Sequence, residues 1–181
     1  MLGKLDTRVA TDHPDLLAGP VHAFLRQWAP AGQVLVAPID PSLADTAAFC
    51  DAYGVGLAES ANCVVISGKR DGVTRYAACV VLATTRADVN TVARKLLDVR
   101  KASFAPMAEA VELTGMEYGG ITPLGLPEPW PVFVDAAVVA AGPVVVGSGI
   151  RASKVVLPGA LLADLPAARV VDGLGVPVPT A

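Results

Sequence analysis

Residues 113–125 read Leu-Thr-Gly-Met-Glu-Tyr-Gly-Gly-Ile-Thr-Pro-Leu-Gly, and the last seven of them hold three glycines and a proline. Glycine allows a positive φ and lets another molecule approach the backbone closely, and proline stiffens the exit from the turn. A rigid loop of this composition presents amide N–H groups instead of side chains. If Gly119–Pro123 is a binding site, we expect it to bind carbonyl or phosphate oxygens through the main chain.

The length and hydropathy of the chain indicate one soluble domain. A chain of 181 residues is long enough to bury a core. Its apolar residues make up 53% of the sequence, in short runs broken by Gly, Pro or charge. None of these runs reaches the ~18 apolar residues that a membrane-spanning helix needs, and Met1–Asp6 lacks the apolar segment of a signal peptide. We expect a cytoplasmic protein that binds no membrane.

The chain has few residues suited to nucleophilic or metal catalysis. Its three cysteines are widely spaced and form no Cys-x-x-Cys pair, so we expect buried thiols and neither a disulfide framework nor a zinc site. The two histidines, His13 and His22, lie near the N-terminus, and no Gly-x-Ser-x-Gly motif accompanies them. We therefore expect no metal and no other cofactor.

Charge gives a mixed signal about nucleic acid. The net charge of −3 argues against a protein that coats DNA or RNA nonspecifically, and we expect no DNA partner. Five basic residues nevertheless fall within sixteen positions: Arg86, Arg94, Lys95, Arg100 and Lys101. This cluster is interpreted either as a solvated helix face or as a local patch that contacts phosphates.

Secondary-structure signals alternate along the chain and include a hairpin around Gly68–Gly72. Asp88 is a candidate N-cap, and Gly54 and Gly115 are expected to end helices. The predicted helices span residues 21–28, 43–53, 88–97, 106–113 and 158–165. The predicted strands span 34–39, 61–67, 73–83, 102–105, 131–134, 144–147, 154–157 and 169–171.

This order of elements predicts an α+β fold. Strands and helices do not alternate strictly, so we expect a mixed, mainly antiparallel β-sheet packed with surrounding helices. No internal repeat is visible, and no linker divides the chain. Residues 1–173 are predicted to form a single domain, and residues 174–181, which lack a helical pattern, a flexible C-terminal tail.

Several segments match a known family in its order. They are residues 46–55, 61–66, 101–106, 112–115, 119–123, 132–135 and 147–149, and the pairing of Leu-Thr-Gly with Gly-Gly-Ile-Thr-Pro is the most specific. From about Asp45 to Leu165 the chain resembles the YbaK/EbsC family. Its members are aminoacyl-tRNA deacylases related to the editing domain inserted in bacterial prolyl-tRNA synthetases.

The resemblance implies a small pocket for the 3′ end of a mischarged tRNA, with an aminoacyl-tRNA synthetase as a possible partner. In the family the Gly-x-x-x-Pro loop, here Gly119, Gly120, Ile121, Thr122 and Pro123, lies against the aminoacyl ester and the terminal ribose. Water, or a hydroxyl of the terminal adenosine, supports attack on the ester while backbone amides hold the reacting groups. A loop that presents backbone, in a chain without an evident nucleophile, agrees with this chemistry.

The chain departs from the family pattern at two positions. Many members carry a lysine in the first hairpin strand, where this chain has Asn62, which can hydrogen-bond but carries no charge. Many also carry an acidic residue after the Gly-x-Gly turn, where this chain has Lys154. Lys154 could compensate for the missing lysine if both side chains face the pocket.

The remaining candidates for substrate binding have structural alternatives. The turn of Gly147, Ser148 and Gly149 either approaches the pocket or only joins two strands, and Asp135 either reaches substrate or caps the next segment. Phe104 and Tyr118 either pack or stack on the terminal adenine.

Three functions remain open at this point: a trans-editing deacylase, a binding module that has lost its chemistry, and a hydrolase of another small ester or amide. The amino acid removed, the tRNA and the oligomeric state are left open by the sequence.

Overall fold

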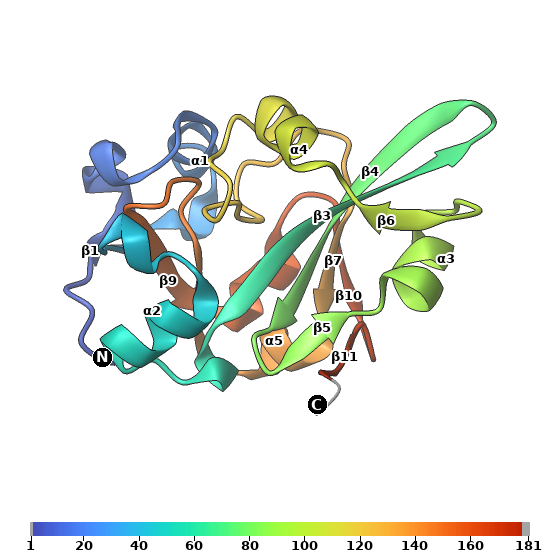
Figure 1. Ribbon diagram of the computed structural model, residues 1–181. Helices are drawn as coiled ribbons and strands as arrows, with labels where there is room; N and C mark the ends of the chain where they lie inside the picture. Colours follow the sequence, from blue (N-terminus) through green and yellow to red (C-terminus); the bar gives the residue numbers. More distant parts are fainter. Residues whose placement is uncertain (1, 179–181) are drawn as a thin grey trace.

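The structure is a computed structural model that describes residues 2–178 (Figure 1). Its frame is two β-sheets. One is antiparallel, in the order β1-β2-β9-β8, and the other is mixed, in the order β10-β7-β4-β3-β6. A two-stranded ribbon pairs β11 with β5. The strands are β1 Arg8–Val9, β2 Leu35–Pro38, β3 Ala61–Arg70, β4 Val73–Leu82, β5 Thr85–Ala87, β6 Ala102–Phe104, β7 Val132–Asp135, β8 Pro143–Gly147, β9 Ser153–Pro158, β10 Ala168–Val171 and β11 Gly175–Pro177.

The helices are short, and their ends follow local sequence signals. Gly54 and Gly115 each take φ +66° and terminate α2 and α4 in the left-handed conformation that favours glycine. The Asp88 side chain accepts a hydrogen bond from the Thr91 N–H (3.0 Å) and caps the π-helical turn before α3. The α-helices are α1 Gly19–Leu25, α2 Thr46–Tyr53, α3 Arg94–Leu96, α4 Met107–Thr114 and α5 Ala136–Ala140.

The hairpin of β3 and β4 is longer than the sequence pattern predicts. The strands pair as far as Arg70 and Val73, which leaves Asp71 and Gly72 as a two-residue turn. Both turn residues have positive φ (51° and 79°), as the favoured tight hairpin turns require. Residues 68–70, predicted as loop, therefore belong to the strand, and the hairpin projects from the body of the molecule (Figure 1).

The apolar side chains form three buried clusters. The largest lies between the two sheets and includes Val21, Val80 and Leu157. A second packs Ile66 and Phe133 against the segment around α3, and a third packs α2 against β2 and β9. The predicted α+β class with mainly antiparallel pairing is thus confirmed, although the strands divide into two sheets. No helix within residues 2–178 is both long and apolar enough to cross a membrane.

The end of the chain differs from the prediction. Residues from 174 on were expected to form a tail, but Leu174 is fully buried and Gly175–Pro177 pairs with β5. The Gly175 N–H also donates to an Asp135 carboxylate oxygen (2.5 Å). Strands of three residues are too short to show an alternation of apolar and polar side chains, so the sequence did not predict β5 and β11. Residues 179–181 of the predicted tail lie outside the described residues.

Replacing Leu174 with alanine should therefore lower the free energy of unfolding by about 2–5 kcal/mol, because a large side chain leaves a packed core. Urea denaturation followed by circular dichroism measures this. Val178→Ala is the matched control, because Val178 is 55% exposed and should change stability by less than about 0.5 kcal/mol. If both variants had the same free energy of unfolding, residues 174–178 would instead behave as a flexible tail.

Candidate functional site

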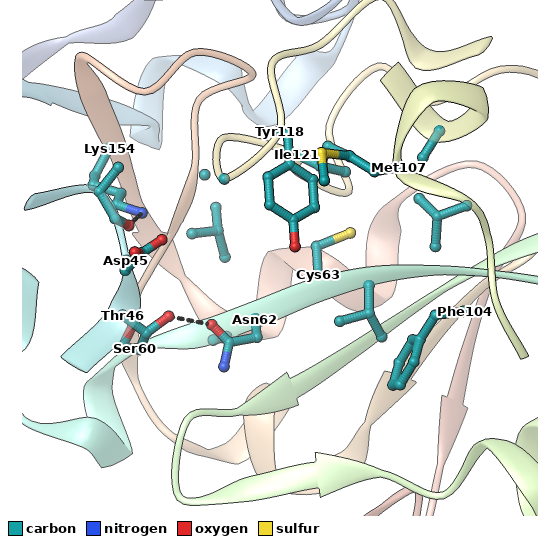
Figure 2. Close-up of a pocket in the computed structure, with 18 of the residues that line it drawn as sticks. Asp45, Thr46, Ser60, Asn62, Cys63, Phe104, Met107, Tyr118, Ile121 and Lys154 are labelled. Carbon is teal, nitrogen blue, oxygen red and sulfur yellow. Dashed lines mark hydrogen bonds between the residues drawn. The ribbon is translucent and has the colours of Figure 1, made fainter. Parts of the chain in front are cut away.

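A cavity of about 520 Å³ opens between the two sheets, the start of α2 and α4 (Figure 2). This volume is within the range of small-molecule sites. Its lining combines a polar end around α2 and β9 with an apolar end around α4. The lining residues are Ala44, Asp45, Thr46, Ser60, Ala61, Asn62, Cys63, Val64, Val65, Phe104, Ala105, Met107, Ala110, Tyr118, Gly119, Ile121, Val145, Val146, Gly147 and Lys154.

The glycine-rich loop forms one wall of the cavity. Gly119 has φ +84° and, with Ile121, lines the cavity. The Gly120 N–H donates to the Glu117 carbonyl oxygen (2.9 Å). Within residues 2–178, the N–H groups of Gly119 and Ile121 donate to no protein acceptor. Two backbone donors of residues that line the cavity are thus left without a protein partner.

Close backbone contacts explain two further glycines. A Cβ on Gly120 would lie 2.6 Å from the backbone of Ile150, and a Cβ on Gly147 would lie 2.3 Å from the Gly120 carbonyl oxygen. The Gly149 N–H donates to that same oxygen (2.7 Å). The loop and the turn after β8 thus pack backbone to backbone, which fixes the loop.

Arg151 fastens the loop from outside. Its Nη1 donates to the Tyr118 carbonyl oxygen (3.3 Å), and its Nη2 donates to the Pro41 carbonyl oxygen (3.1 Å). Its backbone N–H donates to a Glu117 carboxylate oxygen (2.6 Å). A Cβ on Gly119 would lie only 2.3 Å from Nη1. One guanidinium therefore holds the loop to the segment before α2, provided that residue 119 is glycine.

Asn62 lies on β3 beside the start of α2. Its Oδ1 accepts a hydrogen bond from the Thr46 Oγ1 (2.7 Å), which fixes the amide plane (Figure 2). Within the described chain its Nδ2 has no acceptor. The β3 position that the family pattern assigns to lysine therefore holds a neutral, oriented amide with free donors.

Lys154 supplies a cation to the cavity from β9. The residue is 9% exposed, and its Nζ donates to the Ala44 carbonyl oxygen (2.9 Å) and lies 5.3 Å from the centre of the Phe49 ring. No carboxylate of residues 2–178 lies within 4.0 Å of this ammonium. Burial lowers the pKa of Lys154, and nearby Arg151 lowers it further. Asn62 and Lys154 thus line one cavity from different sheets (Figure 2).

The thiols are poor nucleophiles. Cys63 lines the cavity, but burial raises its pKa far above the usual value for a thiol. Burial also raises the pKa of Cys79 to about 12 and raises that of Cys50. All three therefore stay protonated at neutral pH, and the thiolate is the reactive form. Neither His13 nor His22 lines the cavity.

Six predicted site residues do not line the cavity. Gly120, Ser148 and Gly149 are buried in the backbone contact behind the loop, where Ser148 Oγ donates to the Ser153 carbonyl oxygen (3.1 Å). Asp135 caps α5 by accepting from the Ala137 N–H (2.8 Å). Thr122 is fully buried, and Pro123 borders a separate cavity of about 270 Å³ beside Phe24 and Trp130.

The cavity lining includes two exposed aromatic side chains and several residues that the sequence did not predict. Phe104 and Tyr118 are 61% and 55% exposed and line the cavity, so neither side chain is buried by packing. Sequence reasoning missed other lining side chains, among them Asp45, Thr46, Ser60, Cys63 and Met107. Asp45 and Thr46 sit at the start of a predicted helix, but only the packing of that helix against β9 brings them to the cavity.

Comparisons with known proteins agree with this architecture. A crystal structure described as a candidate trans-editing enzyme for prolyl tRNA synthetase superimposes with a TM-score of 0.72 at 22% identity, covering 86% of this chain and 94% of that one. The structure of hypothetical protein APE2540 also gives 0.72 at 21% identity, covering 84% and 97%. At these identities the likeness concerns the fold. Comparison with curated protein sequences found no match.

The family model named aminoacyl-tRNA editing domain matches residues 40–165, well over half of the chain. The matched span contains both walls of the cavity, from Asp45 to Lys154. The chain therefore belongs to the aminoacyl-tRNA editing domain family.

Proposed function

We propose that this protein is a trans-editing deacylase, which hydrolyses the ester between a wrong amino acid and the 3′ end of a tRNA. The observation that supports this best is the wall at Gly119 and Ile121, which adjoins a cavity of suitable size and whose N–H groups have no acceptor among residues 2–178. Such donors stabilise the negative charge that develops on a carbonyl oxygen during acyl transfer. The family to which the chain belongs supports the same reaction class.

The proposed reaction uses water as the nucleophile. The water oxygen bonds to the ester carbonyl carbon, and the carbonyl oxygen takes negative charge beside the loop amides. The bond to the ribose oxygen then breaks, that oxygen receives the proton that the attacking water loses, and a free amino acid and a tRNA hydroxyl result. An aminoacyl ester is already activated, so positioning and charge stabilisation supply the acceleration. A hydroxyl of the terminal adenosine can help to orient the water.

Two polar side chains complete the proposed site. The Lys154 ammonium has three N–H donors, of which Ala44 takes one, so two remain for substrate oxygens. The Asn62 Nδ2 adds a neutral donor from the opposite sheet. We assign Lys154 the role of stabilising charge on the reacting carbonyl and Asn62 that of holding a ribose hydroxyl or the ester.

The cavity mouth suits the end of an RNA strand. Phe104 and Tyr118 expose apolar ring faces there, and a base can stack on such a face for about 1–3 kcal/mol. We therefore propose the terminal adenosine as the group seated at these rings. The reaction is placed in the cytoplasm, with an aminoacyl-tRNA synthetase as a candidate partner.

The purified protein should release the amino acid from at least one misacylated tRNA in a panel that includes Ala-, Cys- and Ser-charged species. Loss of the ester over time, corrected for spontaneous hydrolysis, is the measurement. If every ester survives at high protein concentration, the deacylase proposal fails.

A non-catalytic binding module is the second candidate, favoured by the neutral Asn62 at the family's lysine position. It predicts binding of a non-hydrolysable aminoacyl-adenosine analogue without turnover of any ester in the panel. Recovery of hydrolysis in Asn62→Lys would support this reading over the deacylase.

A further inference from the structure

The basic residues of the chain are concentrated in one stretch. Residues 69–101 hold eight Lys and Arg against three Asp, a net charge of +5, so the rest of the chain carries −8 of the total −3. Neither residues 27–68 nor residues 102–150 contain any Lys or Arg. Such an asymmetry in an acidic protein indicates a local surface for an anionic partner.

The fold gathers most of the basic residues of this stretch at one end of the molecule. The β3–β4 hairpin, β6 and α3 lie together there, and α2 lies on the opposite side of the molecule (Figure 1). Gly68 of β3 pairs with Ala102 of β6, and the two strands are antiparallel. Lys69, which follows Gly68, therefore lies beside Lys101, which precedes Ala102. We call this surface the basic end; it consists of Lys69, Arg70, Arg75, Lys95, Arg100 and Lys101.

Most of the charge at the basic end is uncompensated. Two of its six basic side chains are paired: Arg70 and Arg75 contact the Asp98 carboxylate at 2.6 and 3.0 Å, and Arg70 also lies 3.6 Å from the Asp71 carboxylate. Two guanidinium groups and two carboxylates compensate one another. Within residues 2–178, no carboxylate lies within 4.0 Å of the other four side chains, all of them exposed. Two adjacent lysines without a neighbouring acid repel each other, and a bound anion reduces this repulsion.

The basic end begins where the cavity ends. Phe104 lines the cavity and is the last residue of β6, and Lys101 lies three residues earlier, about 10 Å away along an extended strand. Residues 40–59, which comprise α2 and its flanks, carry Asp40, Asp45, Asp51 and Glu59 and no Lys or Arg. Lys154 and Arg151 contact the Ala44 and Pro41 carbonyl oxygens at the start of this side. Beyond these two cations the segment is acidic, whereas the basic end attracts a phosphate chain that leaves the cavity beside Phe104.

We propose that the basic end binds the phosphates of the tRNA acceptor strand, so that the RNA leaves the cavity over Phe104 and follows β6. This inference rests on the proposed function for the identity of the RNA. It adds the direction in which the RNA lies and the side chains that hold it.

The test compares two triple variants with the same loss of charge. Lys69→Gln/Arg100→Gln/Lys101→Gln removes three cations of the basic end, and Lys4→Gln/Arg86→Gln/Arg169→Gln removes three exposed cations elsewhere. Fluorescence anisotropy with uncharged tRNA, at salt from about 0.05 to 0.3 M, gives the affinity and its salt dependence. The basic-end variant should bind about 10- to 100-fold more weakly near 0.1 M, with the slope of log K against log salt reduced by about 2. The control should keep the slope of the unmodified protein.

Kinetics separates docking from chemistry. For aminoacyl-tRNA the basic-end variant should raise KM and leave kcat unchanged, and hydrolysis of aminoacyl-adenosine should not change. The inference would be overturned if both variants gave the same slope of log K against log salt. It would also be overturned if the basic-end variant lost as much activity on aminoacyl-adenosine as on aminoacyl-tRNA. Preferred binding of anionic lipid vesicles over an acceptor-stem hairpin would overturn it as well. If no ester is hydrolysed, the proposed function fails, while the anisotropy result still decides whether this surface binds RNA.

Discussion

Replacing Gly119 with alanine should lower kcat for aminoacyl-tRNA hydrolysis by about 100-fold or more while the fold is retained. Two effects combine. A φ of +84° strains any residue with a Cβ by about 1–2 kcal/mol. The new Cβ also meets Arg151 Nη1 at 2.3 Å, so this end of the guanidinium must shift, which disturbs its hydrogen bond to the Tyr118 carbonyl oxygen. Both effects displace the N–H groups of Gly119 and Ile121 from the position at which we propose that they meet the substrate.

Gly142→Ala is the matched control for Gly119→Ala. Gly142 also has positive φ (+78°), but a Cβ there meets no atom within 4 Å, and the residue does not line the cavity. Both variants should lose comparable stability in urea denaturation, and only Gly119→Ala should lose activity. Arg151→Met separates the two causes, because it removes the guanidinium contacts to Tyr118 and Pro41 while Gly119 keeps its φ. Full activity in Gly119→Ala would exclude the loop as an oxyanion site.

The parts of the fold that follow from local chemistry could be predicted from the sequence. Gly54, Asp88 and Gly115 end or begin helices as expected, because a left-handed residue or a side-chain cap acts within one turn. The division into two sheets could not be predicted, because strand pairing depends on contacts far apart in the chain. The burial of Leu174 likewise depends on pairing with β5, about ninety residues earlier.

The site shows the same limit. The composition of the loop predicts that it presents its backbone, but not which of its residues line the cavity. Successive residues point in different directions, so Ile121 lines the cavity while Thr122 is buried in the protein. Asp135 matched a family segment, yet its carboxylate is used by the Ala137 and Gly175 N–H groups. Asn62 and Lys154 lie on strands of different sheets, and only the packing of those sheets brings both to one cavity.

Replacing Lys154 with methionine should lower kcat/KM for deacylation by about 100-fold, because a charged donor to the reacting carbonyl is lost. The free energy of unfolding should rise or stay unchanged. The Lys154 ammonium is 9% exposed and has no carboxylate of the described residues within 4.0 Å, so it is costly to bury, whereas methionine fills a similar volume beside Phe49. A variant that loses activity without losing stability cannot be explained by misfolding.

The pH dependence of the rate and of stability tests the role of Lys154 independently. Burial, reinforced by Arg151, lowers its pKa below the ordinary 10.5, while Cys50 and Asp45 oppose the shift. The catalysed rate, corrected for spontaneous hydrolysis, should therefore fall as pH rises through this lowered pKa. Lys154→Arg should move that limb to higher pH, because a guanidinium keeps its proton. Between the lowered pKa and 10.5 the unfolded chain binds more protons, so stability should rise with pH, and Lys154→Met should abolish this rise.

The double variant Asn62→Lys/Lys154→Met moves the single cation to the opposite wall of the cavity. If Lys154 acts by donating to a substrate oxygen, a lysine at position 62 should recover part of the lost rate, because its ammonium enters the same cavity from β3. Recovery would show that the site needs a cation and tolerates either wall. A Lys154→Met variant with unchanged kcat and pH profile would instead mean that Lys154 only holds the Ala44 carbonyl at the start of α2, and the loop amides alone would then carry the chemistry.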